Sequence, residues 1–472
     1  MRRGSPQVGM LKIRRAIDAA EADFRKCWAI LCSWKQNAPD TGPILLDFQP
    51  TLAGALFNLD QVYNQVVAYR GSLIENRGRR PRESLSARLR RLNEYSNALK
   101  ETMAIGRSLG DAFAWPFYSN SPEMLRKHLA HAPIRHFPTG IGGRGEVEFI
   151  RHARAEKHFV PHHGITSFLR VGDVSFVDLQ AWTVTSLGEL KSHGTKPGQV
   201  NVTLHAVSGS PENLPRLFAI PEIFIEGSLD VRPSALSELK FRRRLGAQVV
   251  GMKSVLSREK HDFRSSLFRA YYTEEFSQLA EKIRKARVGY ARVGPGGTLV
   301  AVRPFRSRKI SSKLSTRQTG ESIASSCEAL PKLVADSCDK DSSENSIMAG
   351  GLSTAFGWGS LPFFWWPVDL EFLEQLYFQD VFIFSCYNPV HLFKRLRKSG
   401  FEIFNADTQK PIVKRRSDDR VCEFENFDFF LRSIQHYLMR EERVAELLDY
   451  ASSGIHVASM PARIEIEMVP MI

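Results

Sequence analysis

The sequence has few cysteines, and no two of them form a Cys-x-x-Cys pair. Six scattered thiols in 472 residues supply neither a disulfide framework nor a cysteine-rich zinc site, so a reducing, cytoplasmic setting is expected. Long hydrophobic runs are also missing. No apolar signal core follows the basic first residues, and the most apolar run, 361–366, is too short to cross a bilayer. The sequence therefore predicts a soluble protein with no membrane partner.

Nucleotide-binding loops are missing as well. The stretch 140–146, with the sequence GIGGRGE, is rich in glycine, but no predicted strand precedes it and no Gly-Lys-Ser/Thr ends it. We expect a flexible turn there, followed by a strand over 147–151. Backbone amides of such a turn could contact a phosphate.

Positive charge is abundant. The chain has 65 Lys and Arg against 51 Asp and Glu, a formal net charge of +14, and a pI near 9.5. This balance favours polyanionic partners such as nucleic acid, although many basic proteins bind nothing anionic. The length favours about two or three structural units.

Two neighbouring stretches, 170–178 and 185–192, have the β-branched and apolar residues and the flanking turn signals of adjacent strands. Asp173 lies at the start of the first strand. Side chains alternate along a strand, so Glu189 and Lys191 should share one face while Leu190 points to the opposite, buried side. Two carboxylates and an ammonium group at one sheet edge suit a divalent cation and an oxyanion.

Asp173, fifteen intervening residues and then Glu189-Leu190-Lys191 resembles the signature of the PD-(D/E)xK, or restriction-endonuclease-like, nuclease superfamily. Gly172 stands where that superfamily usually has proline. The resemblance implies an α/β fold with a mixed-sheet core flanked by helices. It also implies hydrolysis of nucleic acid, with DNA the expected substrate and defence or restriction the expected setting. Asp173 and Glu189 would hold Mg²⁺ or Mn²⁺, and Lys191 would orient the attacking water.

Two further residues are candidates for this site. Asp111 lies in the apolar half of a helix predicted over 84–118, where an acid needs a partner or a metal. It could be an accessory metal ligand, as could Glu101 on the same helix, or it could cap the helix or pair with an arginine. In related nucleases a later helix often carries a polar residue near the metal, and Gln248 on the predicted basic helix 234–256 is the match.

A histidine pair precedes the strand motif. His162 and His163 belong to a strand-like run over 158–170, and neighbouring strand residues face opposite sides, so at most one could serve the site. Structural roles are the simpler interpretation. A histidine facing the acids could position a phosphate or a water.

The composition predicts four regions. Residues 1–83 form a helical region, 84–305 the nuclease core, 306–349 a disordered linker or insertion, and 350–472 a small C-terminal α/β segment. Inside the core, 288–302 has the form of a hairpin.

The aromatic-rich stretch 356–366 could stack on bases, but without polar interleaving it favours a packed core. It could also serve as a surface for a protein partner or a second copy of the chain. Residues 414–416, with the sequence KRR, favour a solvated basic loop.

The competing hypothesis is a non-catalytic, basic nucleic-acid-binding or scaffold protein. In that case Asp173, Glu189 and Lys191 are ordinary exposed charges on a strand, with Glu189 and Lys191 as a surface ion pair. The two hypotheses differ in geometry, because a nuclease needs the acids and the lysine gathered together and shielded.

Overall fold

The computed structural model describes residues 10–452 except for gaps at 37–41, 78–81, 120–121, 132–136, 139, 156–158, 179–182, 197–198, 209–269, 305–308, 313–322, 353, 355–360, 409, 418–419 and 425–426. The chain divides into two compact units. Unit 1 comprises Met1–Asp262 with Lys309–Leu314, and unit 2 comprises Phe263–Arg308 with Ser315–Ile472.

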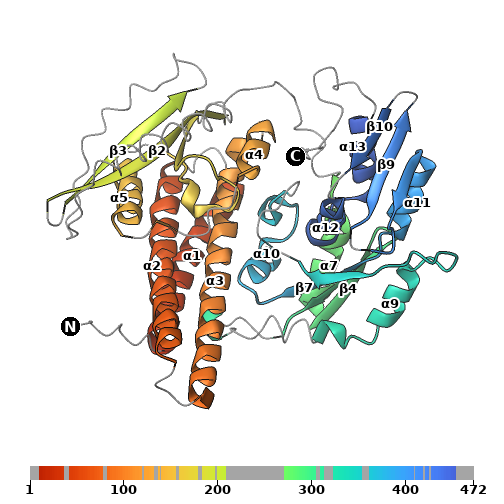
Figure 1. The fold of residues 1–472 in the computed structure, drawn as a ribbon, viewed down its shortest axis with the longest axis horizontal. Helices are drawn as coiled ribbons and strands as arrows, with labels where there is room; N and C mark the ends of the chain where they lie inside the picture. Colours follow the sequence, from red (N-terminus) through yellow and green to blue (C-terminus); the bar gives the residue numbers. More distant parts are fainter. Residues whose placement is uncertain are drawn as a thin grey trace. The chain divides into compact units, whose positions relative to one another are not determined.

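Unit 1 begins with three long helices that run side by side (Figure 1): α1 (Met10–Gln36), α2 (Gly42–Glu75) and α3 (Arg82–Tyr118). Apolar residues at helical spacing form the buried side of α1, namely Ile13, Ile17, Ala20, Phe24, Cys27, Trp28 and Leu31. Stacked rings join the helices, with Phe48 of α2 against Phe113 of α3 at 4.3 Å between ring centroids. The predicted N-terminal helical region is confirmed.

A three-stranded antiparallel sheet lies next to the helices, in the order β1 (Val174–Asp178), β2 (Thr183–Lys196) and β3 (Gln199–Ser208). One face of the sheet packs on α5 (Ile141–Ala155), which Figure 1 shows alongside β2 and β3. Leu190 and Val174 of the sheet share a buried cluster with Phe149 and Ala153 of α5. The α/β class is confirmed. In the described residues the sheet is wholly antiparallel, whereas a mixed sheet was expected.

Two local predictions in this region are wrong. Residues 141–151 belong to α5 and form no strand, because Val147, Phe149, Ile150 and Ala153 repeat at helical spacing and bury one side. The described part of the run 158–170, residues 159–170, is not a strand either. It makes a single bridge at His162 and then a 3₁₀ turn, η3 (His163–Ile165).

Helix α3 approaches η3 closely at a glycine. A Cβ atom added to Gly110 would lie 2.0 Å from the carbonyl oxygen of Ile165, so only glycine fits there. The short helix α4 (Pro122–Leu129) follows α3. These contacts support the segment that leads into β1.

Unit 2 is built around a second antiparallel sheet with the order β4-β5-β7-β6, formed by β4 (Val288–Val293), β5 (Gly297–Val302), β6 (Met348–Gly351) and β7 (Phe382–Tyr387). The predicted hairpin over 288–302 is confirmed as β4 and β5. A third sheet contains β8 (Phe401–Phe404), β9 (Ile412–Ser417) and β10 (Arg420–Phe424).

The helical elements of unit 2 are α7 (Thr273–Lys285), α9 (Leu330–Ser337), α10 (Leu370–Tyr377), α11 (Val390–Lys398), α12 (Asp428–Tyr437), α13 (Glu441–Ser452) and the 3₁₀ turn η8 (Phe363–Trp365). The described part of the aromatic stretch, residues 361–366, packs internally, as the composition favoured: Phe363 stacks on Phe276 at 5.3 Å between ring centroids, and Trp366 is buried. Residues 356–360 lie outside the described residues.

The predicted region boundaries differ from the two units. Helix α7 and strands β4 and β5 belong to unit 2 although the predicted core extended to residue 305. The predicted linker 306–349 contains α9, the start of β6 and the 3₁₀ turn η7 (Ile310–Ser312), which belongs to unit 1. These elements could not be predicted from the polar composition of the segment, because each is short and buries few side chains.

Candidate functional site

Asp173 forms hydrogen bonds with the backbone of the two residues that flank Glu189 on β2. The backbone N–H of Asp173 donates to the carbonyl of Gly188 at 2.7 Å, and the backbone N–H of Leu190 donates to Asp173 Oδ2 at 2.7 Å. Strand β1 starts at the next residue and pairs Val174 with Gly188. The acid before β1 is therefore held on the backbone on both sides of the acid of β2.

Glu189 and Lys191 lie on the same face of β2, opposite the buried Leu190, as the alternation predicted. Lys191 Nζ forms an ion pair with Glu189 Oε1. The side chains are only 17% and 4% exposed, respectively. An exposed surface pair, which the competing hypothesis required, does not have this burial.

A third acid, Glu146 of α5, comes near Asp173. The preceding Gly145 packs directly on β2, since an added Cβ atom would lie 2.0 Å from Ser192 Oγ. Glu146 is 7% exposed. Sequence reasoning missed this residue because the glycines at 140–145 were taken for a turn. The signal that could have found it is the helical spacing of the apolar residues after it.

Burial raises the pKa of Asp173 well above its ordinary value, and the nearby carboxylates of Glu146 and Glu189 raise it further. The Leu190 N–H and the Lys191 ammonium act in the opposite direction without cancelling the effect. Asp173 is thus the common neighbour of two other acids, and the ionised form of its carboxyl is disfavoured there.

Buried histidines support the segment before β1. The backbone N–H of His163 donates to the Asp173 carbonyl at 2.8 Å, and its ring contacts the Gly172 carbonyl through Nδ1 at 2.9 Å and Ser175 Oγ through Nε2 at 2.5 Å. Tyr118 also bonds Ser175. Burial lowers the pKa of His163 to about 3, so the ring is neutral and holds the chain in place.

The other histidine of the pair faces the acids. His162 Nε2 lies 3.1 Å from Glu146 Oε2. Its ring stacks on Phe137 with centroids 5.6 Å apart and an interplanar angle of 3°. The two neighbouring histidines therefore contact different residues, although the segment that holds them is not the expected strand.

Asp111 is held by Ser167, and the guanidinium groups of Arg107 and Arg170 lie near enough to interact with its charge, as the alternative of an arginine partner expected. Both of its carboxylate oxygens accept from Ser167 at 2.6 Å, one from the backbone N–H and one from the hydroxyl. Asp111 is 1% exposed, and this arrangement anchors the segment after η3 to α3. Glu101 lies ten residues earlier on α3, about 15 Å along the helix axis. Gln248 lies outside the described residues.

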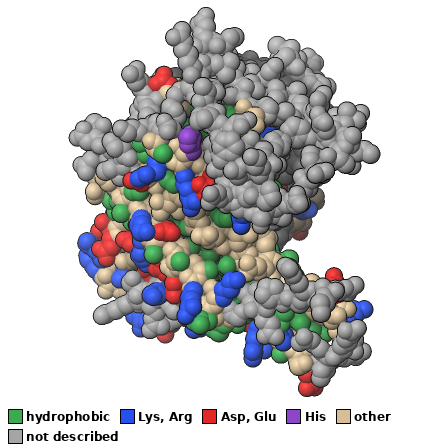
Figure 2. Space-filling model, turned by 90° about the vertical axis from the view of Figure 1, so that its left-hand side faces the viewer, with side chains coloured by type: hydrophobic (Ala, Val, Ile, Leu, Met, Phe, Trp, Pro, Cys, Tyr) green, Lys and Arg blue, Asp and Glu red, His purple; other side chains and the backbone are tan. Residues whose placement is uncertain are grey.

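The three basic side chains of the stretch 414–416 each pair with an acid. Lys414 pairs with Glu423 at 2.7 Å, Arg416 pairs with Glu402 at 3.3 Å, and Arg415 pairs with Asp449. Their stretch forms part of β9 and is not a loop. In Figure 2, Lys and Arg side chains are interspersed with Asp and Glu on the face that is shown. The described residues of that face present no patch of one sign.

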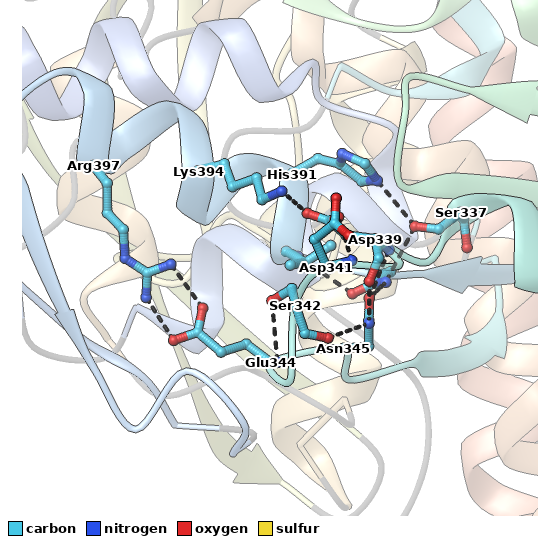
Figure 3. A network of polar contacts seen from close by, with 11 residues as sticks. Ser337, Asp339, Asp341, Ser342, Glu344, Asn345, His391, Lys394 and Arg397 are labelled. Atoms are coloured by element: carbon cyan, nitrogen blue, oxygen red, sulfur yellow. Dashed lines mark hydrogen bonds and ion pairs between the residues drawn. The ribbon is translucent and has the colours of Figure 1, made fainter.

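A second concentration of charge lies in unit 2, where the segment 337–345 meets α11 (Figure 3). Arg397 makes a two-pronged contact with Glu344 at 2.7 Å, and Lys394 pairs with Asp339. His391 Nε2 contacts the Ser337 carbonyl at 3.0 Å. Each of these acids is matched by a base, so the network fastens the segment to the helix.

Within the described ranges, no group of three or more His, Cys, Asp or Glu side chains is already arranged to hold a metal ion. The same ranges contain no helix that is both long and apolar enough to cross a membrane. Comparison with protein-family models, with curated proteins and with solved structures gives no match to this chain.

Proposed function

We propose that the chain is a metal-dependent nuclease that hydrolyses phosphodiester bonds in nucleic acid, with DNA the expected substrate. One observation carries the proposal. Asp173 is hydrogen-bonded to the residues on both sides of Glu189, and Lys191 pairs with Glu189 on the same face of the strand. This arrangement supports the resemblance of Asp173 and Glu189-Leu190-Lys191 to the PD-(D/E)xK signature.

The residues present fit a hard divalent cation. Asp173 and Glu189 supply carboxylate oxygens, with Glu146 as a third acid, and such ligands suit Mg²⁺ or Mn²⁺. The ionised form of Asp173, which its surroundings disfavour, is the form that a cation would stabilise. When bound, the cation would lower the pKa of water and stabilise charge on the phosphoryl oxygens.

The side chains of this chain have separate tasks in the proposal. Asp173 and Glu189 would hold the cation between them. Lys191, a cation two residues after Glu189, orients the attacking water and attracts the scissile phosphate. Burial of Glu189 keeps bulk water from competing for the same carboxylate.

The test compares the wild-type chain with Glu189→Gln and Lys191→Met, which preserve side-chain size. Circular single-stranded DNA, plasmid and RNA are incubated with Mg²⁺, Mn²⁺ or EDTA. We expect cation-dependent cleavage by the wild type and a loss of about 100-fold or more in each variant. Glu344→Gln in unit 2 is the matched control, because it removes a paired acid far along the sequence from the motif. Equal cleavage by wild type and Glu189→Gln would refute the site.

A non-catalytic nucleic-acid-binding or scaffold role is the second candidate. It is favoured by the lack, in the described ranges, of a ready three-residue metal group, whereas the burial of the Lys191–Glu189 pair opposes it. It predicts binding of the same nucleic acids without cleavage under every cation condition. Filter binding performed alongside the cleavage assay distinguishes the two.

A further inference from the structure

His162 occupies a fully enclosed position between the candidate site and the helices of unit 1. Its side chain is 1% exposed, and the Glu146 side chain that it faces is 9% exposed. The ring of Phe137 covers one side of the imidazole. A polar ring in such a place needs a partner for each nitrogen.

The contacts determine which nitrogen of His162 carries the proton. Nδ1 accepts a hydrogen bond from the backbone N–H of Gly164 at 3.1 Å, so the neutral ring is protonated on Nε2. Nε2 lies 3.1 Å from Glu146 Oε2, although its N–H is not aligned with that oxygen, and the described residues offer it no aligned hydrogen-bond partner. Glu146 is therefore the acid that this nitrogen contacts.

The backbone of His162 is fixed as firmly as its ring. Its N–H donates to Oε1 of the buried Gln49 on α2 at 2.7 Å, and the residue forms an antiparallel bridge with Val174. The next residue donates its N–H to the Asp173 carbonyl at 2.8 Å. One short segment thus contacts the backbone of Asp173 and the side chain of Glu146.

We infer that His162 is a positioning residue, which holds the Glu146 carboxylate beside Asp173 through the 3.1 Å contact of its Nε2 with Oε2; this rests on the proposed function. His162 is not itself a metal ligand, because the Gly164 N–H occupies the lone pair of Nδ1 and a proton occupies Nε2. The donor set is then entirely oxygen. A partner that orients a ligating carboxylate typically contributes 10- to 100-fold, as an order of magnitude, to metal affinity.

Two substitutions separate this role from a merely structural one. A glutamine amide reaches about as far as Nε2 and can donate to Glu146, whereas an asparagine oxygen reaches about as far as Nδ1 and can only accept from Gly164. Mn²⁺ binding to the full chain is followed by the electron paramagnetic resonance signal of free Mn²⁺. We expect His162→Gln to retain near-wild-type affinity and His162→Asn to lose about 10- to 100-fold.

A double variant and a control complete the experiment. In the Glu146→Gln background, His162→Asn should have no additional effect on Mn²⁺ affinity, because the carboxylate that it positions is already gone. His128→Asn changes another fully buried histidine of unit 1 that contacts the backbone of Arg170 and Val171, and it should leave Mn²⁺ affinity unchanged.

The outcomes separate failure of this inference from failure of the proposed function. Suppose that the wild type binds Mn²⁺ and cleaves nucleic acid. If His162→Asn then binds Mn²⁺ as tightly as the wild type, or if His162→Asn keeps the Mn²⁺ affinity that His162→Gln loses, the positioning role is overturned and the nuclease proposal stands. If the wild type neither binds Mn²⁺ nor cleaves any substrate, both are overturned. Binding with the expected Gln and Asn difference but no cleavage supports the positioning role and refutes the nuclease.

Discussion

At the scale of single residues, the strand motif was accessible to sequence reasoning and its surroundings were not. Alternation along a strand places Glu189 and Lys191 on one face whatever the rest of the fold does. Glu146 could not be found in the same way, because its approach to Asp173 depends on the packing of α5 against β2 at Gly145. Asp111 shows the reverse problem: burial was inferred correctly, but its partner, Ser167, lies 56 positions away in sequence.

The charge around Asp173 leads to a prediction about stability. Its pKa is raised by burial and by Glu146 and Glu189, so without metal the folded state holds this proton more tightly than the unfolded state. Stability then falls as pH rises from the ordinary aspartate value through the raised pKa. Asp173→Asn, which resembles the protonated form, should raise the thermal midpoint of the metal-free protein by several degrees at pH 8.

Scanning calorimetry at pH 5 and pH 8 checks this prediction. The advantage of Asp173→Asn over wild type should be larger at pH 8, because the wild type loses stability as pH rises above the ordinary aspartate pKa whereas the amide does not titrate. Mg²⁺ should then stabilise only the wild type and narrow the difference. A variant less stable than wild type at both pH values would contradict the prediction.

At the scale of elements, the helix expected over 84–118 lies close to the observed bounds of α3, because an amphipathic pattern is a local property. Helix ends that depend on tertiary packing are harder to predict. The final helical stretch divides into α12 and α13, and the backbone of Leu438 between them is left-handed, with φ of 56°. Leu438 is fully buried, so tertiary packing prevails over its local preference for a continued helix.

The contact of α3 with η3 can be tested at a glycine. Gly110→Ala would bring Cβ to 2.0 Å from the Ile165 carbonyl oxygen, which is backbone and cannot rotate away. We expect a loss of about 1–3 kcal/mol in the free energy of unfolding, as for other overpacked sites. Gly54→Ala on α2 is the matched control, because nothing lies within 4 Å of its added Cβ.

The control should be neutral or gain about 0.5–1 kcal/mol, since alanine is the better helix former. Urea unfolding of both variants followed by circular dichroism gives the comparison. Equal stability of the two variants would show that α3 and η3 are further apart than the structure places them.

The first turn of α13 contains a buried acid that should make unit 2 sensitive to pH. Glu441 is 1% exposed, and burial raises its pKa to about 7 although the Tyr387 hydroxyl donates to it at 3.0 Å. Glu442 adds to the rise and Arg395 opposes it. The protonated form favours folding, so stability should decline as pH rises from about 4.5 through about 7 and then level off.

Glu441→Gln isolates this contribution. Between pH 4.5 and 8 the free energy of unfolding of the variant should fall by about 3 kcal/mol less than that of the wild type, at roughly 1.36 kcal/mol for each unit of pKa shift. Urea midpoints measured across this range provide the test. Parallel pH profiles for wild type and Glu441→Gln would show that Glu441 does not titrate in the folded protein.

At the scale of the whole molecule, neither unit is one continuous stretch of the sequence, because a short segment of unit 1 lies within the sequence of unit 2. Composition placed a linker over 306–349, yet Lys309–Leu314 belongs to unit 1, after the first hairpin of unit 2. Two hydrogen bonds hold this returning segment, 309–314, on unit 1. The Ile310 N–H donates to Glu21 Oε2 at 2.6 Å, and the Ser311 hydroxyl donates to Asp18 Oδ1 at 2.5 Å. A six-residue return has no periodicity, so sequence patterns could not reveal it.

This return predicts that a substitution late in the sequence weakens the first unit. Ile310 is 4% exposed, and Ile310→Ala should cost about 2–5 kcal/mol, as for other buried isoleucines. Hydrogen exchange followed by mass spectrometry should show lost protection in α1, whose Asp18 and Glu21 hold the segment, while β5 and β7 of unit 2 keep theirs. Ile347→Ala in unit 2 is the matched control, because that side chain is 40% exposed and its truncation should change stability by no more than about 0.5 kcal/mol. Lost protection confined to unit 2 in Ile310→Ala would mean that the segment belongs to the second unit and that unit 1 is complete without it.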